Sequence, residues 1–190
     1  MGHVEKGRNI FYHAQIEEIT EYLTNNPYIK NAVVSRRLPS TLVITVTERA
    51  EKLAVKYDDD YLVMDETGIL LRKTNTTPMI TMLEGVVVSK IKLGEKIGTT
   101  DGKKMDRALK LVKSTSKADL YFVRIDMNVE EKVNAYVYDN LVVKTDYDTL
   151  LENIENGRLH RVLEKLFSDG IQRGTISFEE DGSASFMPIF

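Results

Sequence analysis

The 190-residue chain contains no cysteine, which excludes disulfide bonds, thiol catalysis and cysteine-ligated metal sites. It also lacks long apolar runs. The longest, of about four residues, are far shorter than the roughly 20 residues that a membrane-spanning helix needs. No apolar segment follows Met1-Gly2-His3, so the sequence predicts no signal peptide and a soluble chain. The net charge of −3 favours neither nucleic acid nor anionic lipid as a partner.

Motifs of common active sites are also missing. The chain has neither of the glycine-rich phosphate-binding patterns and no Gly-x-Ser-x-Gly nucleophile motif. Its histidines, His3, His13 and His160, have no second histidine at His-x-x-x-His spacing. Asp58-Asp59-Asp60 lacks the spaced oxygens and glycine of a calcium loop and reads as a solvated turn. We therefore expect no enzyme activity, no cofactor and no metal site.

What is present is a hairpin pattern over residues 31–49. Leu42, Ile44 and Val46 alternate and fall on one face of a predicted strand. Pro39 has a preset φ and no N–H group, so residues 38–41 are expected to form the turn before that strand. A helix beginning near residue 12 and stopping before Pro27 precedes the hairpin.

The remaining pattern mixes short strands with helices and favours an α+β fold. A long helix is expected from an N-cap at Asp148 to Gly170, or two helices that meet at Gly157. Residues 73–102 are rich in threonine and glycine and predict a covering loop with little regular structure. The other expected elements are strands 53–57, 61–65 and 69–71 as an antiparallel meander, helix 103–113, strand 120–127 with Tyr121, Val123, Ile125 and Met127 on one face, hairpin 133–146, and a last hairpin of strands 175–179 and 183–187.

The last predicted strand is the most suggestive binding surface. A second chain could approach the backbone of Ser183, Ala184 and Ser185 closely, because their side chains are small. Phe186 and Met187 would supply apolar anchors beside them. An exposed strand edge of this kind can be extended by a partner strand. The alternative is a short polar edge of the sort that ends many sheets.

The chain resembles the extracytoplasmic region of the bacterial cell-division proteins FtsQ/DivIB. The resemblance spans most of the sequence and is most specific between Asn26 and Gly68. The stretches that carry it are Gly7-Arg8-Asn9-Ile10-Phe11, Asn26-Pro27-Tyr28-Ile29-Lys30-Asn31-Ala32, Arg37-Leu38-Pro39-Ser40-Thr41-Leu42 with the strand that follows, and Leu62-Val63-Met64-Asp65-Glu66-Thr67-Gly68.

This resemblance implies a POTRA module (polypeptide-transport-associated) over residues 1–50. A mostly antiparallel β-domain with a packed C-terminal helix would follow over residues 51–190. It also implies a non-enzymatic divisome scaffold outside the cytoplasmic membrane, with one upstream span and partners of the FtsL and FtsB/DivIC type. In the family the FtsB/DivIC partner docks by strand addition near the end of the β-domain, which here corresponds to residues 183–187. A second candidate contact consists of Arg36, Arg37 and Pro39. The alternative is that these residues only form the turn.

The sequence departs from the family pattern at two places. Family members usually have proline two residues after Glu48-Arg49, where this chain has Glu51. A complete POTRA module has a strand and a helix before the Gly7 stretch, so we expect an incomplete module whose sheet has an open edge. Two other functions stay open: a POTRA-bearing polypeptide-binding module of an outer-membrane assembly or secretion machine, and, with less support, a cell-wall enzyme.

Overall fold

The computed structural model describes residues 16–178 and 183–189. Within these residues the helices are α1 (Ile16–Thr24), α2 (Gly102–Lys117), α3 (Tyr147–Glu155) and α4 (Arg158–Ser168). The strands are β1 (Ile29–Arg37), β2 (Thr41–Glu48), β3 (Leu53–Tyr57), β4 (Asp60–Met64), β5 (Leu70–Thr74), β6 (Thr81–Glu84), β7 (Val88–Lys90), β8 (Gly98–Thr99), β9 (Arg124–Asp126), β10 (Lys132–Tyr138), β11 (Leu141–Asp146), β12 (Gly174–Phe178) and β13 (Ala184–Pro188). The predicted α+β class is confirmed.

Most of the strands form one nine-stranded sheet in the order β13-β12-β11-β10-β9-β6-β3-β4-β5. Neighbours are antiparallel except for β3 with β6, β6 with β9, and β11 with β12. The predicted meander is present as β3-β4-β5, and the hairpin at Asp139-Asn140 is β10-β11. The sheet is thus mostly antiparallel, as expected, with parallel pairs that the sequence did not indicate.

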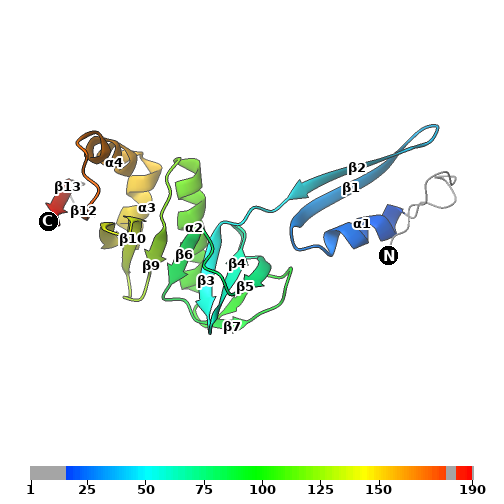
Figure 1. Cartoon of the computed structure of the whole chain (residues 1–190), viewed down its shortest axis with the longest axis horizontal. Coiled ribbons are helices and arrows are strands. Elements are labelled where there is room, and N and C mark those ends of the chain that lie inside the picture. Colours follow the sequence, from blue (N-terminus) through cyan, green and yellow to red (C-terminus); the bar gives the residue numbers. More distant parts are fainter. Residues whose placement is uncertain (1–15, 179–182, 190) are drawn as a thin grey trace.

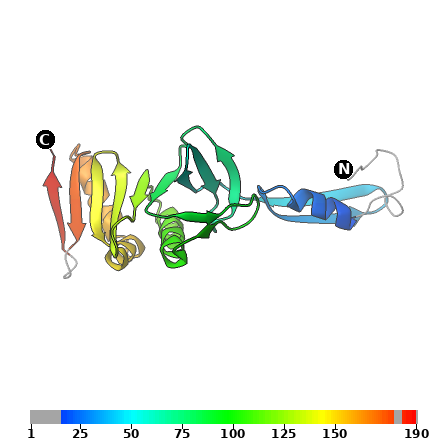
Figure 2. The ribbon, with the colours of Figure 1, turned by 90° about the horizontal axis from the view of Figure 1, so that it is seen from below.

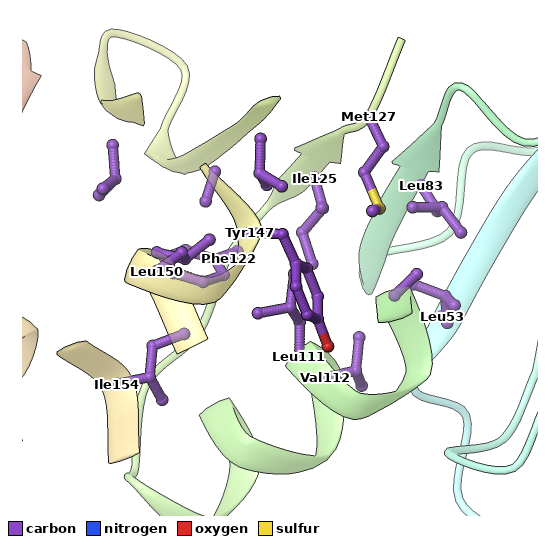
Figure 3. Close-up of a cluster of buried hydrophobic side chains, with 14 of the residues drawn as sticks. Leu53, Leu83, Leu111, Val112, Phe122, Ile125, Met127, Tyr147, Leu150 and Ile154 are labelled. Carbon is purple, nitrogen blue, oxygen red and sulfur yellow. The ribbon is translucent and has the colours of Figure 1, made fainter. Parts of the chain in front are cut away.

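Helices α2, α3 and α4 share one apolar core with this sheet. Figure 3 shows side chains from β3, β6 and β9 directed toward those of α2 and α3. Leu53, Leu111, Ile125 and Leu150 are each fully buried there. In strand β10 buried residues alternate with partly exposed ones, so one face of this strand packs against the helices. The core anchors the C-terminal helix, as predicted.

The helix boundaries follow local capping. Asp101 begins α2 by accepting a hydrogen bond from the Lys104 N–H at 3.0 Å. Asp146, not the predicted Asp148, caps α3 and accepts from the Thr149 N–H at 2.9 Å. Gly157 takes a left-handed conformation with φ of 71°, so the long predicted helix is two helices, α3 and α4. The two-helix interpretation of the glycine was the right one.

The N-terminal elements α1, β1 and β2, here called the hairpin unit, form a separate two-stranded sheet covered by one helix. Ile19 of α1 is buried together with Ala32 and Val34 of β1. Pro39 lies in the turn between the strands, as predicted, after a cis peptide bond. The expected first turn of the helix, near residue 12, lies outside the described residues.

Two sequence-based expectations were wrong. Residues 73–102 are not a plain covering loop, because β6 inserts into the centre of the sheet between β3 and β9. In the segment 120–127 only β9 is a strand. Phe122 is buried there, whereas Tyr121 is 52% exposed. The four residues of β6 and the three of β9 are too few for a sequence pattern to reveal them.

The molecule is elongated. The hairpin unit lies at one end of Figure 1, with its turn pointing away from the nine-stranded sheet, and β13 lies at the other end. No strand pairs the two sheets to each other within the described residues. The chain passes between them through residues 49–52, from the end of β2 to the start of β3.

Candidate partner-binding edge

Strand β13 is one edge of the nine-stranded sheet. It pairs antiparallel with β12 from Phe178↔Ala184 to Gly174↔Pro188. On its outer side no other strand of the described residues is paired with it, as Figure 2 shows. Of the five residues predicted to bind a partner, four lie in β13 and Ser183 immediately precedes it. An edge strand presents unpaired N–H and C=O groups to a neighbouring chain.

The two apolar side chains of β13 have different surroundings. Phe186 is partly buried and packs against the main core. Its ring occupies the space that a side chain on Gly174 would need, with ring atoms 2.5 Å from the ideal Cβ position. Met187 is 72% exposed. Met187 therefore exposes an apolar side chain to solvent, while Phe186 mainly packs β13 against its own sheet.

The direction of the backbone groups in β13 follows from a close approach. The carbonyl oxygen of Met187 lies 2.6 Å from the ideal Cβ position of Gly174, so it points toward β12. In an antiparallel pair, successive residues direct their N–H and C=O groups alternately toward and away from the neighbouring strand. Ala184 and Phe186 consequently direct theirs to the open side. Pro188 would do the same but has no N–H, so it ends the row of donors.

The opposite edge of the sheet, β5, is protected. The Leu70 N–H donates to the Glu95 carbonyl and the Gly94 N–H donates to the Leu70 carbonyl, both at 2.9 Å, so a loop covers that end of the strand. Further along, β5 carries the charged residues Arg72 and Lys73, which oppose edge-to-edge pairing. By contrast, β13 has the sequence Ala-Ser-Phe-Met-Pro, without a charged or titratable side chain. Of the two edges, β13 is the one suited to accept a strand.

The second predicted contact lies elsewhere. Arg36 and Arg37 end β1, and Pro39 lies in the turn that follows. All three are exposed, and Leu38 between them is 66% exposed. Figure 1 places this turn at the end of the molecule opposite β13, so the structure does not bring the two predicted contacts together.

Sequence reasoning missed Gly174 as part of this edge. Its φ is +147°, a conformation that residues with a side chain rarely adopt, and Phe186 fills the space beside it. The signal that could have found it is a glycine that opens one strand of a hairpin whose other strand carries an aromatic residue. An aromatic side chain over an edge glycine is a known means of stabilising such a strand.

Among the described residues, no group of three or more histidine, aspartate or glutamate side chains is placed to hold a metal ion. In the same residues no helix is both long and apolar enough to cross a membrane.

One family model matches the N-terminal part of the chain. Residues 2–49 match the family model "POTRA domain, FtsQ-type". This span includes the hairpin unit, so the N-terminal part of the chain is similar to a POTRA module of the FtsQ type.

Proteins with similar sequences include bacterial cell-division proteins. Cell division protein DivIB of Clostridium acetobutylicum is 32% identical over 96 residues, which are 50% of this chain and 38% of that protein. DivIB of Clostridium botulinum is 24% identical over 191 residues, 96% of this chain and 72% of that protein. The resemblance to the FtsQ/DivIB cell-division proteins is thus confirmed. The relatives are named as division proteins and not as enzymes.

A solved structure, the major extracytoplasmic domain of DivIB from Geobacillus stearothermophilus, is similar over 57% of this chain and 87% of that one. The sequence identity is 17% and the TM-score is 0.35.

Proposed function

We propose that this chain is a non-enzymatic scaffold of the bacterial divisome that binds other division proteins outside the cytoplasmic membrane to support septum formation. Its partners are of the FtsL and FtsB/DivIC type, and one of them adds a strand to β13. The resemblance to DivIB supports the extracytoplasmic location, with a membrane span upstream of these residues. Residues 1–50 act as the POTRA module and residues 51–190 as the β-domain that presents the strand.

One observation carries this proposal: an uncharged edge strand with backbone groups directed to open space. Ala184 and Phe186 offer N–H and C=O groups on the outer side of β13, and Met187 exposes an apolar side chain nearby. Main-chain hydrogen bonds give affinity in strand addition, while side-chain contacts give specificity. Because the strand has no titratable side chain, we expect its pairing to be insensitive to pH near neutrality.

The sharpest test removes one outward donor and leaves the protein's own sheet intact. N-methylation of the Phe186 amide blocks its outward N–H and keeps the phenyl ring on Gly174. The modified chain is made by ligating synthetic residues 184–190, with a cysteine at position 184 converted to alanine afterwards. The conversion is selective because the chain contains no other cysteine. Binding to an immobilised DivIC-type ectodomain is measured by surface plasmon resonance.

We expect this modification to weaken binding by at least about 10-fold, which is about 1.4 kcal/mol. N-methylation of Ile189, which follows β13 and is 55% exposed, is the matched control and should leave binding unchanged. Equal binding by the parent and the Phe186-modified chain would refute strand addition at β13. Phe186→Asp is a poorer test, because it places a charge against the core and loosens β13 itself.

A further inference from the structure

Residues 49–52 connect the hairpin unit to the nine-stranded sheet, and their backbone is attached at both ends. The Arg49 N–H donates to the Tyr28 carbonyl at 2.7 Å, which ties the segment to the residue just before β1. The Lys52 N–H donates to the Met64 carbonyl of β4 at 2.9 Å. The segment contains neither glycine nor proline, so its composition is not that of a flexible linker.

Glu51 joins the two sides of this junction through its side chain. Its Oε1 accepts the Tyr28 hydroxyl at 2.6 Å and the Arg72 Nε–H at 2.6 Å, and its Oε2 accepts the Arg72 Nη2–H at 3.0 Å. Tyr28 belongs to the hairpin unit side and Arg72 lies in β5. A bidentate arginine–carboxylate pair fixes orientation as well as distance, because both groups are planar.

Arg49 adds a second ionic attachment. Its Nη1 donates to Asp65 Oδ2 at 2.7 Å, and the Asp65 side chain is only 5% exposed. The other oxygen, Asp65 Oδ1, accepts from the Thr67 N–H, the Thr67 hydroxyl and the Ile69 N–H. The carboxylate is therefore held in place by hydrogen bonds from its own turn, independently of Arg49. This makes it a fixed point on the nine-stranded sheet.

We infer that Tyr28, Arg49, Glu51, Asp65 and Arg72, here called the junction clasp, hold the hairpin unit at one orientation to the nine-stranded sheet. The two sheets share no strand pairing within the described residues, so strand hydrogen bonds do not fix their relative orientation. The side-chain contacts of the clasp fix it instead. Without them, relative motion between two such units is the ordinary expectation. The clasp turns an elongated molecule into a rigid spacer.

The consequence is geometric. The hairpin turn and β13 lie at opposite ends of the molecule in Figure 1. A rigid junction fixes the separation and the relative direction of these two ends, so a protein held at one end is presented at a set distance and angle to the other. This inference concerns the junction and does not depend on which partner binds β13.

The absence of native cysteine allows a direct test with two nitroxide labels on the whole chain. Thr45→Cys on β2 and Lys113→Cys on α2 place one label on each side of the junction at exposed positions. Double electron–electron resonance then measures the distribution of label-to-label distances. In the doubly labelled parent we expect one narrow distribution.

Glu51→Ala, which removes all three side-chain bonds of Glu51, should at least double the width of that distribution. Tyr28→Phe removes one hydroxyl and should broaden it less, which keeps the test valid if the alanine variant folds poorly. Asp60→Ala is the matched control, since it removes the Lys73–Asp60 ion pair away from the junction and should change nothing. A broad distribution in the parent, or unchanged widths in both clasp variants, would overturn the inference.

Discussion

Asp65→Asn is the substitution whose effect the structure defines most closely. Asparagine keeps a carbonyl oxygen in place of Oδ1, so the bonds from Thr67 and Ile69 can persist. It replaces Oδ2, 2.7 Å from Arg49 Nη1, with an N–H₂ group that cannot accept a hydrogen bond. The change therefore isolates the Arg49 contact and leaves the guanidinium without its carboxylate.

The expected cost follows from burial. Breaking a fully buried ion pair costs about 3–5 kcal/mol, and a hydrogen bond to a charged group contributes about 1.5–3 kcal/mol. The Asp65 side chain is 5% exposed, but that of Arg49 is 19% exposed and keeps some contact with water. We therefore expect a loss of about 2–3 kcal/mol in the free energy of unfolding, or roughly 5–10 °C in Tm.

Urea unfolding followed by far-ultraviolet circular dichroism measures this loss. Asp126→Asn is the matched control, because Asp126 also accepts bonds within a turn, but its donors are the backbone and side-chain amides of Asn128 and the amide of Asn134. The control should lose no more than about 1 kcal/mol. If Asp65→Asn loses no more than this control, the reasoning about the Arg49 contact is wrong.

Two further predictions concern pH and backbone space. The Arg72 hydrogen bond is the main cause that lowers the pKa of Glu51, whereas burial alone would raise the pKa of Asp65 and the bonds from Thr67 and Arg49 more than reverse it. Both folded-state pKa values lie below their ordinary range. The stability that these two groups contribute is therefore complete above their unfolded-state pKa values and is lost as pH falls through their folded-state values. The urea midpoint should fall on acidification from pH 7, and it should fall by a smaller amount in Asp65→Asn. Gly174→Ala should destabilise the β12–β13 pair by about 1–3 kcal/mol, because φ at Gly174 is +147° and the new Cβ would lie 2.5 Å from the Phe186 ring. Gly102→Ala is the control: no atom lies within 4 Å of its ideal Cβ position, so the same urea titration should show no loss of stability.

Sequence patterns predicted the elements that depend on local chemistry. The alternation at Leu42, Ile44 and Val46 and the turn at Pro39 identified β1 and β2, and the pair Asp139-Asn140 identified the β10–β11 hairpin. The position of residues 184–187 in a last hairpin strand was also foreseen. In these cases the decisive interactions lie within a few residues of the chain.

The features that were missed depend on distant parts of the chain. Strand β6 is a strand because β3 and β9 flank it in the sheet, and its own four residues do not reveal this. Phe122 is buried and Tyr121 exposed because of where the chain enters the sheet. The inward direction of Phe186 depends on Gly174 in another strand, and the clasp joins residues up to 23 positions apart.

The central claim is that β13 lends its outward backbone groups to a partner strand, and amide hydrogen–deuterium exchange tests it most directly. In the free chain the Ala184 and Phe186 amides should exchange quickly, and those of Ser185 and Met187, which face β12, should be protected. Adding a DivIC-type ectodomain should slow exchange at Ala184 and Phe186 by at least about 10-fold. Slower exchange elsewhere in the chain, with Ala184 and Phe186 unchanged, would contradict the account.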